Sequence, residues 1–291
     1  MLSPDLLWEF LDHSGYRPNP AEFLTHYNSL HKYDTISQEE ICRYVGKPDM
    51  SIVVGLIGTD GIVLATDSQR TEYNYSTRTR KLWALTPNIG LMTFGYHGGY
   101  RDFLIELWRE TFASSDTAIG YMETVSRFAH GVKPNVEHYY STELLRTLIE
   151  KDQGFDFVLA GYAGKNEPKI ISVRIQNFFA HEECPPCYID GVKDVGIYWS
   201  KKTGLDDMIA NRQLPCDFLK KFAVMVILET IVFSDMVCEP IQLAVVNEKG
   251  FHDKSEEVEG IKQELDPRNK WLYDYLEKLG QKVWLKKGGG I

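Results

Sequence analysis

The chain changes its hydrophobic pattern near residue 50. Residues 1–50 carry apolar side chains at spacings of three and four, which is typical of amphipathic helices. From residue 51 onward, apolar and β-branched residues form short runs bounded by turn residues, which is typical of strands buried on both faces. These runs predict strands over 51–57, 62–66, 81–86, 90–96, 155–162, 169–175 and 241–246. The first two flank Gly58-Thr59-Asp60-Gly61 and therefore predict a hairpin.

Helical spacing returns between these strands. It predicts amphipathic helices over 102–113, 118–130 and 143–151, a strongly apolar helix over 216–233 and a terminal helix over 266–280. Strands come in pairs along the chain and are followed by helices. This order favours paired sheets with helices outside them over a Rossmann-type alternation.

Composition narrows the class of protein. Of the 291 residues, 43% are hydrophobic and 25% are charged, which is ordinary for a globular protein. The 41 acidic and 32 basic residues give a net charge of −9, which disfavours nucleic acid as a partner. No apolar run reaches the roughly 18 residues of a membrane span. The first residues lack the basic region of a secretory signal, so we expect no membrane association and a cytoplasmic location with reduced thiols.

The predicted hairpin gathers residues with nucleophilic chemistry. Its second strand ends at Asp67, which folds back beside Ser51 at the start of the first strand. Lys81 begins the next strand, and Gly95 lies at the end of another. In such a set the serine hydroxyl attacks, a base takes its proton, and lysine lowers the pKa of that base. Aspartate keeps the lysine charged, and a backbone N–H receives the oxyanion. The alternative is an ordinary strand end with solvated charged residues.

The same residues carry a resemblance to a known family. The run S-I-V-V-G-L, its D-G turn and the strand I-V-L-A-T-D-S resemble the opening of proteasome β-type subunits, which are N-terminal nucleophile (Ntn) hydrolases. The segments R-K-L-W-A-L and G-L-M-T-F-G-Y resemble the later strands that hold the family's lysine and oxyanion glycine. The resemblance covers about 51–250. It implies an α+β fold, a four-layer α-β-β-α sandwich, with helical extensions at the two ends, 1–50 and 251–291.

The resemblance also implies an activity. It implies peptide-bond hydrolysis inside an oligomeric ring, without a cofactor, on a peptide or unfolded protein substrate. The base in this family is the free α-amine of the nucleophile, so residues 1–50 would be a propeptide that is removed. The implied catalytic residues are Ser51, Asp67, Lys81, Gly95 and, through an alignment shifted by one residue, Asp235.

Several positions depart from the family pattern. Ser51 and Ile52 stand where the family has two threonines, and Met50 stands where self-processing members have glycine. The family's glycine-serine-glycine segment has no clear counterpart around Gly191. One alternative is therefore a non-catalytic ring-forming or scaffold subunit that keeps residues 1–50 and uses Asp67 and Lys81 as a structural ion pair. Another is a hydrolase or transferase that acts on a small amide.

Two further motifs carry weaker signals. The segment His181-Glu-Glu-Cys184-Pro-Pro-Cys187 holds three residue types that bind zinc, but no fourth ligand is evident. We therefore expect no metal there, and interpret the segment as a hairpin tip or surface loop with free thiols. His97 follows Gly95 by two residues and is either part of a substrate pocket or an ordinary turn residue.

Overall fold

The computed structural model describes most of the chain between Ser51 and Leu265. The described residues are 51–72, 75–95, 100–114, 120–139, 155–174, 180–193, 196–197, 200–201, 204–234 and 237–265. The helices expected within 1–50, over 143–151 and over 266–280 lie outside these residues.

Five antiparallel strands form the first sheet, in the order β10-β1-β2-β11-β12. Their bounds are β1 Ile52–Ile57, β2 Ile62–Thr66, β10 Cys187–Gly191, β11 Gln242–Asn247 and β12 Gly250–Asp253. The strands β1 and β2 are buried along their whole length because both faces carry apolar side chains. Their hairpin is confirmed: Ile57 pairs with Ile62, and the Gly58 N–H donates to the Gly61 carbonyl at 2.8 Å.

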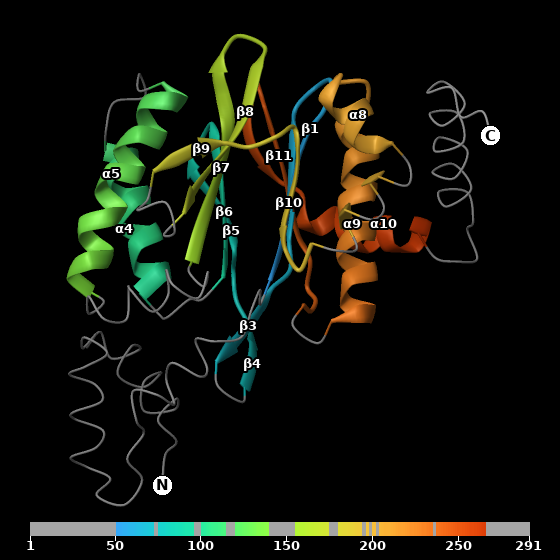
Figure 1. Cartoon of the computed structure of the whole chain (residues 1–291), viewed down its shortest axis with the longest axis horizontal. Coiled ribbons are helices and arrows are strands. Elements are labelled where there is room, and N and C mark those ends of the chain that lie inside the picture. Colours follow the sequence, from blue (N-terminus) through green and yellow to red (C-terminus); the bar gives the residue numbers. More distant parts are fainter. Residues whose placement is uncertain are drawn as a thin grey trace, which may run out of the picture.

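A second antiparallel sheet has the order β5-β6-β7-β8-β9. Its strands are β5 Leu82–Thr86, β6 Ile89–Gly95, β7 Phe155–Gly164, β8 Glu167–Arg174 and β9 His181–Glu183. A separate two-stranded ribbon connects β2 to β5, formed by β3 Gln69–Glu72 and β4 Tyr75–Arg78. In Figure 1 this ribbon extends below the two sheets.

Helices cover the outer face of each sheet, so the layers run helix, sheet, sheet, helix (Figure 1). The helices α4 Tyr100–Ser114 and α5 Tyr121–Tyr139 pack on the second sheet. The helices α8 Leu205–Ala210, α9 Cys216–Phe233 and α10 Val258–Leu265 pack on the first. A third apolar cluster fills the space between the two sheets. The fold is therefore α+β, as predicted. None of the helices in the described part of the chain is long and apolar enough to cross a bilayer.

The long apolar elements lie where the sequence predicts them, and the short polar ones were not predicted. The apolar helix expected over 216–233 is α9. The strands β3, β4, β9, β10 and β12 went unpredicted because they are short and none of them is a continuous apolar run. Residues 251–265 pack on the same body, because β12 pairs with β11 and the buried side chains of α10 join the core around α9.

A polar cluster joins the two sheets close to the start of β1. The Arg174 guanidinium on β8 donates to the Asp190 carboxylate on β10 and, at 2.7 Å, to the Tyr188 hydroxyl. That hydroxyl donates to Asp190 Oδ2 at 2.9 Å, and Lys193 Nζ lies 3.3 Å from Asp190 Oδ1. Burial acts to raise the pKa of Asp190, but Arg174, Lys193 and the hydrogen bonds outweigh it and hold that pKa below its ordinary value of 3.8.

This depressed pKa predicts a pH-dependent part of stability. The unfolded state binds the proton of Asp190 more readily, so the stabilisation is present above pH 3.8 and is lost as the pH falls through the native-state pKa. Asp190→Asn should therefore be less stable than the wild type at neutral pH, and the two should converge in acid. Urea unfolding between about pH 2 and pH 7 measures this. Glu123→Gln, in an exposed pair with Arg127, is the control. A difference between Asp190→Asn and wild type that stays constant with pH would contradict the assignment.

Candidate active site

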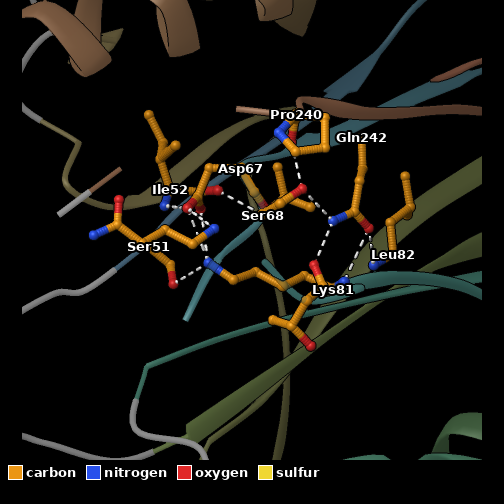
Figure 2. A network of polar contacts seen from close by, with 11 residues as sticks. Ser51, Ile52, Asp67, Ser68, Lys81, Leu82, Pro240 and Gln242 are labelled. Carbon is orange, nitrogen blue, oxygen red and sulfur yellow. Dashed lines mark hydrogen bonds and ion pairs between the residues drawn. The ribbon is translucent and has the colours of Figure 1, made fainter. Parts of the chain in front are cut away.

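Three of the predicted site residues meet at one end of the sandwich. The β1–β2 register pairs Val53 with Thr66, which places Asp67 beside the start of β1. Lys81, which precedes β5 in the other sheet, directs its ammonium toward both. Its Nζ lies 2.7 Å from Ser51 Oγ and 2.9 and 3.0 Å from the two oxygens of Asp67 (Figure 2). The hairpin prediction that Asp67 lies near Ser51 thus agrees with the geometry.

The Asp67–Lys81 pair is withdrawn from water. Both side chains are 0% exposed, and Ser51 is 2% exposed. The Asp67 carboxylate also accepts the Ile52 N–H at 3.1 Å and the Gln69 N–H at 2.8 Å. Burial raises the pKa of Asp67, while the Lys81 ammonium and the two backbone N–H groups act in the opposite direction. A charged lysine beside a serine hydroxyl stabilises negative charge that develops on the hydroxyl oxygen. It also favours the neutral form of a nearby base.

The backbone around Ser51 is fixed by β10 and β2. The Val192 N–H donates to the Ser51 carbonyl at 2.9 Å, and Thr66 Oγ1 donates to the Ile52 carbonyl at 2.8 Å. Gly191 pairs with Ile52 and has φ +81°, a conformation that favours glycine. A Cβ at position 191 would lie 2.0 Å from the Ser51 carbonyl oxygen, so only glycine allows β10 to approach this closely.

The remaining predicted site residues have different outcomes. Gly95 ends β6 with φ +89°, at the same end of the sheet as Lys81, because the Thr93 N–H donates to the Lys81 carbonyl at 3.0 Å. Its role as the oxyanion donor stays a prediction. Asp235 and His97 lie outside the described residues.

The segment that contains these site residues matches a known protein family. Residues 51–176 match the family model described as proteasome subunit. The match begins at Ser51 and contains Asp67, Lys81 and Gly95. This part of the chain is therefore similar to proteasome subunits. The resemblance seen in the sequence is thereby confirmed, over less than half of the chain.

A solved structure extends the likeness beyond the proteasome-family segment. The chain is similar to Anbu (ancestral beta-subunit) from Yersinia bercovieri, with a TM-score of 0.57 and 12% identity, over 77% of this chain and 96% of that chain. At this level of identity the similarity shows that the fold is shared. A search of curated proteins finds no match to the chain.

Residues beyond the proteasome-family segment complete the site, and sequence reasoning missed one of them. Gln242 on β11 bonds to the backbone of Lys81 and to Ser68, the residue after Asp67 (Figure 2). The available signal was a single polar residue in the apolar run I-Q-L-A-V-V, where a buried amide needs partners. Its partners could not be read from the sequence because they lie on other strands.

The Cys-Pro-Pro-Cys segment crosses from β9 in one sheet to β10 in the other. Cys184 belongs to the apolar cluster between the sheets, while Cys187 packs toward the α9 side. Burial raises the pKa of Cys184 to about 11 and that of Cys187 to about 12, which keeps both thiols protonated. Within the described residues, no group of three or more His, Cys, Asp and Glu side chains is arranged to hold a metal ion. The interpretation as a hairpin tip is wrong, because β9 and β10 belong to different sheets, and both cysteines are free thiols.

Proposed function

We propose that this chain is an N-terminal nucleophile peptidase with Ser51 as its nucleophile. Ser51 Oγ attacks the carbonyl carbon of a peptide bond and passes its proton to the free α-amine of Ser51, which returns a proton to the leaving amine. Water then hydrolyses the Ser51 ester and restores the hydroxyl. Gly95 N–H receives the oxyanion, and Asp235 supports the amine. The observation that carries the proposal is the 2.7 Å contact between Lys81 Nζ and Ser51 Oγ inside a fully buried ion pair.

The mechanism needs the bond between Met50 and Ser51 to be broken, because an internal serine has an amide nitrogen and no base. The contacts described above use Ser51 Oγ, the Ser51 carbonyl and the Ile52 N–H, which all survive that cleavage. An ordinary α-amine has a pKa of about 7.7–8.0. The nearby Lys81 ammonium favours the neutral form of that amine, which is the form that accepts a proton near neutral pH.

The match of residues 51–176 to proteasome subunits supports the choice of a peptide as substrate and of an oligomeric ring as the working assembly. Each residue in this mechanism belongs to the chain, so no cofactor enters the reaction. A cytoplasmic location remains the expectation from the sequence.

Two alternatives compete with this proposal. A non-catalytic ring-forming subunit would keep residues 1–50 and use Asp67 and Lys81 as a structural ion pair, and the residue that favours it is Met50, which stands where self-processing members have glycine. A hydrolase or transferase for small amides would use the same nucleophile. The fully buried lysine argues against a purely structural pair, because apolar residues of the same size would stabilise that position equally well.

Turnover of fluorogenic peptides tests the proposal. The protein is produced with Ser51 as its first residue, and intact mass verifies that terminus. We expect it to release the fluorophore from peptides, to leave small amides such as free glutamine intact, and to form a ring-sized species by light scattering. The matched control is the full chain with residues 1–50 attached, which should be inactive until they are removed. A verified Ser51 terminus with no turnover of any peptide would refute the peptidase.

A further inference from the structure

Gln242 connects the two sheets behind the candidate catalytic residues. It is the first residue of β11 and pairs with Thr66, so it lies one strand away from Asp67 in the first sheet. Its side chain reaches the start of β5 in the second sheet. There Gln242 Oε1 accepts the Lys81 N–H at 2.9 Å and the Leu82 N–H at 3.1 Å (Figure 2).

The amide nitrogen of Gln242 faces the residues that follow β2 and β4. Gln242 Nε2 donates to Ser68 Oγ at 2.8 Å and to the Thr79 carbonyl at 2.9 Å. A glutamine amide has two donors and two acceptor sites, and all four are used here. Because the partners are N–H groups on one side and a carbonyl on the other, only one orientation of the amide satisfies them.

These four bonds fix the backbone that carries the Asp67–Lys81 pair. They hold residues 79, 81 and 82 around the lysine and Ser68 next to the aspartate. Ser68 is fixed further: its hydroxyl donates to the Pro240 carbonyl, and its own carbonyl accepts the Thr79 N–H at 2.8 Å. A lysine side chain has four rotatable methylene groups, so its ammonium stays on a target only when its backbone and its surroundings are both fixed.

We infer that Gln242 is a positioning residue that holds the Lys81 ammonium on Ser51 Oγ and Asp67. The inference rests on the proposed function of Ser51 and adds a residue that does not touch the reacting atoms. Loss of the amide frees the start of β5 from the end of β2, so Lys81 Nζ moves away from Ser51 Oγ. A displacement of about 1 Å in such a group costs roughly 10²-fold in rate.

The surroundings of Gln242 allow substitutions of similar size. A cavity of about 350 Å³ borders this side chain and is also lined by Arg78, Arg80 and Asp253. Gln242→Met keeps the length and removes the amide. Gln242→Glu keeps the acceptor for the two N–H groups and loses the donors to Ser68 Oγ and to the Thr79 carbonyl, so it should hold Lys81 less well than glutamine and better than methionine.

Steady-state kinetics and crystal structures test the inference on protein that begins at Ser51. We expect Gln242→Met to lower kcat by about 10- to 100-fold with KM changed by less than about twofold, and Gln242→Glu to fall between it and the wild type. In the crystal structure of Gln242→Met, Lys81 Nζ should lie beyond hydrogen-bond distance from Ser51 Oγ. The control is Tyr121→Phe, which removes a buried hydroxyl 2.9 Å from the Leu159 carbonyl, away from the site. It should lose stability and keep its kcat.

The outcomes separate the inference from the proposed function. The inference is overturned if Gln242→Met folds, keeps the wild-type kcat and keeps the 2.7 Å distance between Lys81 Nζ and Ser51 Oγ. If the methionine variant does not fold, the same measurements on Gln242→Glu decide. The inference is also overturned if Gln242→Met and Tyr121→Phe are equally stable and lower kcat by the same factor. If the wild type itself shows no turnover, the proposed function fails, and the distance between Lys81 Nζ and Ser51 Oγ in the variant still decides whether Gln242 positions the lysine.

Discussion

Replacing Lys81 by methionine should lower peptide turnover by roughly 10²–10³-fold and cost about 3–5 kcal/mol of unfolding free energy. The ammonium lies against Ser51 Oγ and both oxygens of Asp67, and both charged side chains are 0% exposed. Methionine leaves the Asp67 carboxylate buried with only backbone N–H partners among the contacts described above, which accounts for the loss of stability. Turnover per folded molecule, with urea unfolding alongside, measures both effects.

The double variant Asp67→Asn/Lys81→Met separates catalysis from structure. Removing both charges should restore most of the stability, because no unpaired charge then has to stay buried. Turnover should stay at the level of the single variant, because the ammonium is still missing. If the double variant recovers turnover to within about threefold of the wild type, Lys81 acts only as a structural partner of Asp67.

Ser51→Ala should abolish turnover and leave the protein folded. Alanine as the first residue keeps the α-amine but has no hydroxyl to form the ester, and loss of a nucleophile costs about 10⁴-fold or more. Because the hydroxyl contacts the buried, charged Lys81 side chain, its loss should lower the unfolding free energy by about 1.5–3 kcal/mol. Ser51→Thr keeps the hydroxyl and restricts its rotamer, so it should remain active.

Both variants of Ser51 are compared on protein whose first residue is 51, so that differences in processing do not enter the rates. Unchanged turnover in Ser51→Ala would remove Ser51 from the mechanism. Activity in Ser51→Ala toward small amides alone would assign that side reaction to another residue.

The sequence predicted the parts of the site that depend on local register. A tight turn at Gly58–Gly61 fixes which residue of β2 lies beside the start of β1, and this is why Asp67 could be placed near Ser51. The choice of Lys81 needed the family resemblance, because nothing local says that a strand in the second sheet lies opposite β1. Gly95 could be placed at a strand end, and its φ of +89° agrees with the glycine there.

The parts of the site that could not be predicted from the sequence depend on contacts between the two sheets. Gln242 and the strand β10 act on the site from positions far along the chain, and their partners depend on how the layers pack. The short strand Cys187–Gly191 was not predicted from the sequence because it contains an aspartate and a glycine, which are rare in strands. That aspartate, Asp190, pairs with Arg174 across the two sheets, and that glycine lies against the Ser51 carbonyl. Packing between layers, rather than intrinsic propensity, makes this segment a strand.

Ser51 can act as the nucleophile only as the first residue of the chain, and the intact mass of the active species measures whether it is. Purified protein is separated into fractions, and each fraction is assayed for peptide turnover and weighed by mass spectrometry. We expect turnover to follow the fraction whose chain comprises residues 51–291 and fractions retaining residues 1–50 to be inactive. Turnover in a fraction in which every chain still carries Met50 would contradict the account, because the nitrogen of Ser51 would then be an amide and could not serve as the base.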